Sequence, residues 1–345
     1  MYVNERGIMK TTMKDIAKLA GVSQGTVDRV FNNRSGVNKE TKELVLKIAK
    51  ENNYQFNMYA RALVNTNKNY KIGVVINSIG NDFFVNIIKG MKDSIKTYEQ
   101  NGLSLNIIEL KGYDVEEQIK AIEKIEYNKC DALVITPIDD PKIKEQLTEL
   151  NIPIVTINND LDVEKLAFVG CDYWNNGELA ADTALFLKNI QSILIVTGSN
   201  KMSGHRLRVE GFISRINENF NEKSINIIEG QDDDIETYKK VRDLLSTKSI
   251  DLIYFAAGGI IGGLRAVKES NKEIKIITVD ETPYVVSEIK KNNIIATISQ
   301  QPYLQGKKAI ELAVQHCLFK SIPEDKNIFL TSNIKLSSSN FNLEV

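Results

Sequence analysis

The stretch KDIAKLAGVSQGTVDRVFN, from Lys14 to Asn32, carries the strongest structural signal in this chain of 345 residues. Apolar residues at helical spacing predict a first helix that ends at Gly21, and Ser23 is a good N-cap for a second that runs to about Phe31. The residues expected to face inward are Ile16, Ala17, Leu19 and Ala20, then Val27, Val30 and Phe31. Two short helices joined by a tight turn predict a helix-turn-helix, which reads DNA with the start of its second helix.

A third helix is expected to begin at Asn38 or Thr41. Its inward residues would be Leu44, Val45, Ile48 and Ala49. The next segment, 57–65, favours helix but has too few apolar residues to be buried, so it is not expected to be stable alone. We therefore expect a flexible tail (1–12), a helix-turn-helix domain (13–56), a short helix with linker (57–70) and a body (71–345).

Charge is distributed unevenly along the chain. The whole sequence has 44 Lys and Arg against 45 Asp and Glu, a net charge of -1. Residues 1–64 hold 11 basic and 6 acidic side chains, a net charge of +5, and the remainder holds 33 and 39, a net charge of −6. A basic head on an acidic body indicates a polyanionic partner for the head alone.

After Tyr70, apolar runs typical of β-strands alternate with amphipathic helical stretches over roughly 230 residues. The strands are expected at 71–77, 103–110, 132–136, 152–157, 166–170, 192–197, 225–229, 252–256, 274–279 and 294–298. This alternation predicts parallel sheets with crossover helices, and ten strands are many for one sheet. We expect two α/β lobes divided near 158–162, with ligands at the C-terminal ends of strands.

Several other classes of protein are excluded. A share of 42% apolar and 26% charged residues is ordinary for a globular chain, and no apolar run approaches the length of a membrane span. The three cysteines, Cys130, Cys171 and Cys317, are far apart and are expected to be reduced thiols. We expect a cytoplasmic protein with no secretion signal, no metal site and no cofactor.

Four motifs occur in order and carry a family resemblance: the stretch quoted first, GVNKET at 36–41, Tyr54, and the segment ARAL at 60–63. Together they resemble the LacI/GalR family of transcriptional regulators, and the α/β body resembles that family's core, which is like the ribose- and galactose-binding proteins. The resemblance implies an all-α helix-turn-helix domain followed by a two-lobed, periplasmic-binding-protein-like core with parallel sheets. It implies a repressor that binds a pseudo-palindromic DNA operator as a homodimer and answers to a small sugar or polyol between the lobes.

The resemblance assigns DNA contacts residue by residue. Gln24 and Arg29 have the chemistry to read adenine and guanine, whereas Gly25 has no side chain for a base contact. Asp28 stands where relatives often have Ser, and is expected either to read a cytosine amino group or to pair with Arg29 or Arg34. The resemblance identifies 57–70 as a hinge helix with its linker, and in the family this hinge folds on DNA and inserts a leucine, here Leu63, into the minor groove. Packing of Leu63 on the body is the alternative. The full expected set is Ser23, Gln24, Gly25, Thr26, Asp28, Arg29, Asn32, Arg34, Tyr54, Arg61 and Leu63.

The resemblance also implies an effector site, formed by Asn81, Phe83, Phe84, Asn158, Arg206, Asp280 and Gln300. One of the two phenylalanines is expected to be core. Arg206 is preferred over Arg208, which is expected at the surface. The acidic run 232–234 is expected to be a solvated helix entry. Sugar-binding relatives often have an Asp-Arg pair where this chain has Asn158-Asn159, and an Asn-Asp pair where it has 256–259 (AAGG). This loss of charge favours a neutral sugar, polyol or inositol-like effector over a phosphate or nucleobase.

Three other functions share features with this sequence. A catabolite-control regulator would answer to a protein corepressor. A transport-type solute-binding protein would have a signal peptide and no helix-turn-helix. A nucleotide-dependent enzyme is suggested only by Ala257-x-Gly259-x-x-Gly262, which loosely resembles a dinucleotide fingerprint but lacks its first glycine. The chain has no catalytic motif, and we expect no enzyme activity.

Overall fold

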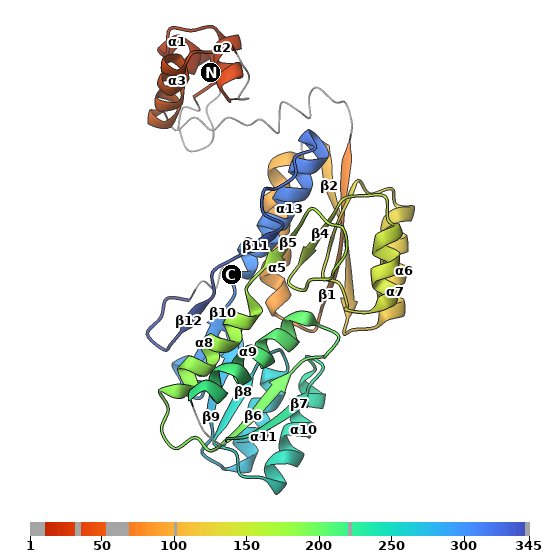
Figure 1. The fold of residues 1–345 in the computed structure, drawn as a ribbon, viewed down its shortest axis with the longest axis vertical. Helices are drawn as coiled ribbons and strands as arrows, with labels where there is room; N and C mark the ends of the chain where they lie inside the picture. The colour runs from red at the N-terminus through yellow and green to blue at the C-terminus, as the bar shows by residue number, and fades with distance from the viewer. Residues whose placement is uncertain (1–10, 32–35, 53–68, 100–101, 220–222, 342–345) are drawn as a thin grey trace. The chain divides into compact units, whose positions relative to one another are not determined.

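A computed structural model describes residues 11–31, 36–52, 69–99, 102–219 and 223–341. The chain divides into two compact units, residues 1–68 and residues 69–345. The ribbon in Figure 1 shows a small helical unit and a larger unit of two α/β lobes. The two units are described separately.

The described part of the first unit contains three helices: α1 (Met13–Leu19), α2 (Gln24–Phe31) and α3 (Lys39–Glu51). Each begins at a polar cap that satisfies backbone N–H groups at the helix start. The Ser23 hydroxyl accepts from the Thr26 N–H at 3.0 Å, and the Asn38 side chain accepts from the Thr41 N–H at 2.7 Å. Both caps stand where the sequence placed them.

A small apolar core holds these helices together, with Ile16, Val27 and Val45 fully buried. Two of the expected inward residues are instead exposed: Leu19 by 57% and Leu44 by 46%. Helical spacing predicts one apolar stripe, but three helices of this length bury only part of it.

The second unit contains two six-stranded sheets within its described part. The first sheet has the order β11 (Asn327–Phe329), β5 (Ala167–Gly170), β4 (Ile154–Ile157), β3 (Ala132–Ile135), β1 (Tyr70–Ile79) and β2 (Leu103–Lys111). The second has the order β12 (Asn333–Lys335), β10 (Ala296–Ser299), β9 (Lys275–Val279), β8 (Leu252–Phe255), β6 (Ser192–Thr197) and β7 (Ser224–Glu229). Neighbouring strands run parallel, except that β12 is antiparallel to β10. The expected parallel two-lobed fold is confirmed.

Helices cover both faces of each sheet, which explains why β3, β4 and β8 are buried along their whole length. In the first lobe, α5 (Phe83–Glu99) lies beside α13 (Pro302–Phe319) on one face, and α6 (Val115–Tyr127) and α7 (Pro141–Glu149) cover the other (Figure 1). The second lobe is covered by α8 (Tyr173–Leu185), α9 (Ser203–Asn219), α10 (Asp234–Thr247), α11 (Ile260–Ser270) and α12 (Pro283–Lys290).

The chain crosses between the lobes in three segments, at 171–172, 300–301 and 330–332. The expected division near 158–162 is therefore wrong, because β5 still pairs with β4 in the first sheet, with Thr156 opposite Phe168. β11 and β12 were not predicted. Each has three residues that are exposed or half-buried, so neither shows the apolar run by which the other strands were found.

In the part of the chain that the structure describes, no helix combines the length and the apolar character needed to cross a bilayer.

Candidate nucleic-acid interface and interlobe cleft

The start of α2 presents a polar surface. Gln24, Gly25 and Arg29 are exposed, whereas Val27 and Val30 on the opposite side of the helix are buried in the core. The amide and the guanidinium are thus free to face outward from the end of the helix that enters the major groove in this motif.

Three other expected contact residues belong to the same helix start. Ser23 uses its hydroxyl for the cap, and this oxygen also lies 3.0 Å from the Thr26 hydroxyl, so these two side chains position the helix as well. Asp28 is half-buried. Asn32, Arg34, Tyr54, Arg61 and Leu63, with most of the hinge, lie outside the described residues.

A buried polar cluster occupies the second lobe where β9 and β10 end. The Arg208 guanidinium donates to the Gln300 side-chain oxygen at 2.6 Å and to the Ala256 carbonyl at 2.9 Å, and the Gln300 amide donates to the Asp280 carboxylate. The guanidinium also lies over the Tyr173 ring, 4.7 Å from its centroid. All three polar residues are nearly inaccessible: Arg208 is 4% exposed, Asp280 8% and Gln300 1%.

This cluster corrects the expectation for the two arginines. Arg208 was expected at the surface, but α9 turns it into the lobe, where its Nε atom is buried without a hydrogen-bond partner among the described residues. Arg206, two residues earlier, is half-buried and forms an ion pair of 2.5 Å with Asp139 of the first lobe. Residues two apart on a helix point in different directions, so their order in sequence could not say which one is buried.

A second polar group joins the lobes directly. Tyr113, which follows β2 in the first lobe, donates its hydroxyl proton to the Asp232 carboxylate, which follows β7 in the second. The Gly258 N–H donates to the other Asp232 oxygen at 2.8 Å, and the His205 Nε2 atom lies 3.9 Å from the oxygen that Tyr113 contacts. His205 Nδ1 accepts from the Ser199 N–H, so the neutral ring keeps its proton on Nε2. Burial lowers the pKa of His205 and so favours that neutral form.

Asp232 was expected in a solvated helix entry, and this is wrong: its side chain is only 11% exposed. Two glycines provide the space that it occupies. A Cβ atom on Gly198 would lie 2.6 Å from the Asp232 carboxylate, and one on Gly258 would meet its Cβ at 3.1 Å. Of the acidic run, only Asp233 acts as expected, by capping α10 through the Ile235 and Glu236 N–H groups.

Two neighbouring cavities lie between the lobes. One, of about 220 Å³, is bordered by Asn81 of the first lobe and by Asp232 and Asp280 of the second. The other, of about 550 Å³, is bordered by Asn81 and Tyr113 on one side and again by Asp232 on the other. Asn81 and Asp280 therefore meet at one cavity, as a cleft site requires, and Asp232 was missed because nothing in the sequence placed it there.

The remaining expected effector residues are placed differently. Phe83 and Phe84 are each 5% exposed and pack edge to face with 5.4 Å between ring centroids, so both are buried where one was expected to be core. The Asn81 side chain accepts from the Phe83 N–H at 3.1 Å, which fixes the start of α5. Asn158 adopts a left-handed backbone (φ 61°), and its amide lies 3.4 Å from the Tyr173 hydroxyl.

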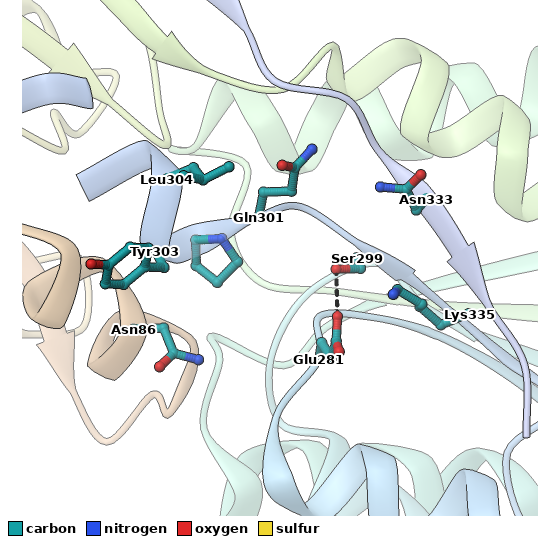
Figure 2. A pocket seen from close by; sticks show the side chains of 9 residues that line it. Asn86, Glu281, Ser299, Gln301, Tyr303, Leu304, Asn333 and Lys335 are labelled. Atoms are coloured by element: carbon teal, nitrogen blue, oxygen red, sulfur yellow. Dashed lines mark hydrogen bonds between the residues drawn. The ribbon is translucent and has the colours of Figure 1, made fainter. Parts of the chain in front are cut away.

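A third cavity, of about 360 Å³, lies beside the crossover segments and is lined by residues such as Asn86, Tyr303, Glu281 and Lys335. Figure 2 shows the Ser299 hydroxyl bonded to the Glu281 carboxylate at its edge, a distance of 2.7 Å. Glu281 and Ser299 line this cavity, although they directly adjoin Asp280 and Gln300 of the buried cluster in sequence. None of the seven expected effector residues lines this cavity.

The buried carboxylate of Asp280 has an altered acidity. Burial raises the pKa of Asp280 to about 6, although the nearby Arg208 charge and the Gln300 hydrogen bond act in the opposite direction. Among the described residues, no group of three His, Cys, Asp or Glu side chains could hold a metal ion. The cavities between the lobes are bordered by amide, phenol and carboxylate groups, which can form hydrogen bonds with a ligand.

Comparisons with known proteins agree with this architecture. Residues 12–57 match the model of bacterial regulatory proteins of the lacI family, and residues 72–321 match a periplasmic binding protein domain. A ribose operon repressor from Halalkalibacterium halodurans is 30% identical over 268 residues, which cover 76% of this chain and 77% of that protein. A probable transcriptional repressor, ExuR of Bacillus subtilis, is 31% identical over 209 residues, covering 59% and 60% of the two chains.

A glucose-galactose binding protein from Geobacillus stearothermophilus has a similar solved structure, with a TM-score of 0.70 and 24% identity over 81% of this chain and all of the other. At this identity the likeness concerns the fold alone. The two family models and the repressor relative together cover nearly all described elements. The lacI family consists of transcriptional regulators rather than enzymes. The chain belongs to the lacI family of bacterial regulatory proteins: it is a DNA-binding transcriptional regulator with an effector domain of the sugar-binding type.

Proposed function

We propose that this regulator is a repressor that binds a pseudo-palindromic operator as a homodimer and is switched by a small sugar or polyol bound between its lobes. The observation that carries the effector part is the Arg208–Gln300–Asp280 cluster, buried at the ends of β9 and β10 beside a cavity bordered by both lobes. Paired acceptors and donors of this kind suit a ligand that is rich in hydroxyl groups.

The DNA part rests on α2. Its exposed Gln24 and Arg29 can form paired hydrogen bonds with adenine and guanine, and the +5 charge of residues 1–64 favours phosphate. One helix-turn-helix reads only a few base pairs, so a dimer that reads two related half-sites gains both affinity and specificity. The symmetry of the operator would then mirror that of the protein.

The switch follows from the position of the cavity. Asn81 and Tyr113 belong to the first lobe, whereas Asp232 and Asp280 belong to the second, so a ligand that contacts both sides favours one degree of lobe closure. Such a rigid-body change can alter the spacing of the two hinges in a dimer and hence their DNA-bound state.

The experiment is a gel shift of the full-length chain with its operator, repeated with a panel of sugars and polyols. A compound that changes operator affinity at least tenfold and also binds by calorimetry supports the proposal. Operator binding that no member of the panel changes, but that a protein partner does change, would assign the chain to the corepressor-type regulators instead.

A further inference from the structure

The charges around the interlobe cavities are strongly one-sided. Four aspartates line the smaller cavity, and no Lys, Arg or His is among the residues that line it; the four are Asp82, Asp232, Asp234 and Asp280. In the larger cavity, Asp232, Asp233 and Asp234 stand against a single cation, Lys111, whose side chain is exposed.

Among the described residues, the buried cation near this wall is Arg208, and it is already engaged. Arg208 is bonded to Gln300 and Ala256, and its positive charge acts on Asp280, whose pKa it lowers against the effect of burial. Arg206 is paired with Asp139. The Arg208 charge thus compensates the carboxylate of Asp280. The second buried carboxylate, that of Asp232, depends on other partners.

Those other partners of Asp232 carry no full charge. They are the Tyr113 hydroxyl, the Gly258 N–H and the His205 ring, whose Nδ1 accepts from the Ser199 N–H as only the neutral ring can. A carboxylate offers about four acceptor sites, and two of them are occupied by Tyr113 and Gly258. Asp232 borders both cavities, so a ligand there can reach its free acceptor sites.

We propose that the effector is an amino sugar or amino polyol whose protonated amine is recognised by Asp232. This inference rests on the proposed function, because it specifies the ligand of the same cleft. The interlobe cavities and the buried Arg208 cluster beside them are the evidence for the site. The role proposed for Asp232 concerns only which sugar the site prefers.

The chemistry of both groups supports this choice. A carboxylate accepts hydrogen bonds only, and an ammonium group supplies three donors together with the missing positive charge. A buried carboxylate without a cationic partner is costly, so a ligand cation gains more there than a hydroxyl does. The same aspartates repel uronic acids and sugar phosphates.

The test is calorimetry on the full-length chain with matched series in which one substituent changes the charge. Glucosamine, glucose and glucuronate form one series; the galacto and manno compounds form two more, and myo-inositol with an amino-deoxy-inositol forms a fourth pair. In the series with suitable hydroxyl geometry, the amine should bind at least tenfold more tightly than the neutral compound, and the acid should not bind measurably.

Two results would overturn the inference in different ways. If the neutral compound binds as tightly as the amine, or the acid binds best, Asp232 does not select an amine, although the proposed sugar or polyol effector stands. If no compound binds in any series, the proposed effector class fails and this inference fails with it.

Substitution locates the effect at one residue. Asp232→Asn keeps an acceptor for Gly258 and removes the charge, so the ratio of amine affinity to neutral-sugar affinity should fall below threefold, whatever the variant does to the affinity for the neutral sugar. Asp162→Asn removes an equally negative but fully exposed side chain and should leave the advantage intact. If Asp232→Asn still bound the amine at least tenfold more tightly than the neutral sugar, Asp232 would not be the residue that recognises the amine. If that variant is unstable, the comparison of compounds on the unaltered chain decides the inference.

Discussion

The hydroxyl group of Tyr113 and the carboxylate of Asp232 form a hydrogen bond that joins the first lobe directly to the second. The Tyr113 ring also packs edge to face on His205, with 6.1 Å between ring centroids. The bond therefore favours a closed arrangement of the lobes, and the aspartate that receives it is the same one that borders both cavities.

Tyr113→Phe should weaken effector binding about five- to tenfold. The substitution removes a hydrogen bond worth about 1 kcal/mol but keeps the ring, so the binding-competent closed state becomes less populated. Calorimetry with the effector measures the change, and Tyr127→Phe, at a side chain that is 85% exposed, serves as control. Tighter binding in Tyr113→Phe would show that this hydroxyl competes with the ligand for Asp232.

The two arginines of α9 should differ in their effect on the switch. Arg208→Gln should retain operator binding but lose the response to effector by about a hundredfold, because Arg208 lies in the buried cluster with an unpaired Nε. Arg206→Gln breaks a half-exposed ion pair with Asp139 and should shift the response less than fivefold. Effector titrations of the operator complex measure both responses.

Arg208→Lys tests whether a loss of folding explains the lost effector response of Arg208→Gln. It keeps the charge beside Asp280, so its thermal midpoint should stay closer to that of the unaltered chain, although the paired bonds to Gln300 and Ala256 are lost. If Arg206→Gln, and not Arg208→Gln, abolished the response, the original preference for Arg206 would be right.

Asp280→Asn should stabilise the ligand-free protein at pH 8. The folded-state pKa of Asp280 is raised to about 6 from 3.8, so the folded chain binds this proton more tightly than the unfolded chain does. Stability is therefore lost as the pH rises from about 4 through 6, by on the order of 3 kcal/mol from this group.

Urea unfolding at pH 5 and pH 8 measures this effect. Asp280→Asn should show less loss of stability between the two pH values than the unaltered chain, and Glu324→Gln, at an exposed site, should behave like the unaltered chain. The gain in stability should be accompanied by weaker effector binding. An equal loss in all three proteins would mean that Asp280 is not the group responsible.

Leu63→Ala should weaken operator affinity at least tenfold and leave effector affinity unchanged. This follows from the hinge hypothesis, in which the leucine side chain separates a base step and the resulting bend allows further contacts. Fluorescence anisotropy with operator DNA measures the first effect and calorimetry the second. Unchanged operator affinity would favour the alternative, in which Leu63 packs on the body.

The sequence predicted what depends on short-range pattern. The caps at Ser23 and Asn38 are hydrogen bonds to backbone N–H groups three residues away, and the buried strands are apolar runs, so both can be recognised locally. The division of the lobes was misplaced because β5 has the same apolar character as the other buried strands. Its place in the first sheet depends on its pairing with β4, which no local sequence pattern reveals.

The site was predicted less completely for a related reason. Asp280 and Gln300 end strands, and parallel strands bring their ends together, so they could be placed. Arg208 and Asp232 could not, because burial of a charged side chain depends on partners distant in sequence. The lack of side chains at Gly198 and Gly258 leaves space for Asp232. Arg208 donates a hydrogen bond to Gln300, which is 92 residues away in sequence.

The most direct test of the central claim is selection of DNA from a random library by the purified full-length chain, followed by affinity measurements across salt concentrations. The account predicts one enriched pseudo-palindrome, bound as a dimer on two half-sites, with an affinity that falls steeply as salt rises and that the effector changes at least tenfold. Enrichment of no sequence at low salt, or of an asymmetric single site bound by one chain regardless of effector, would contradict it.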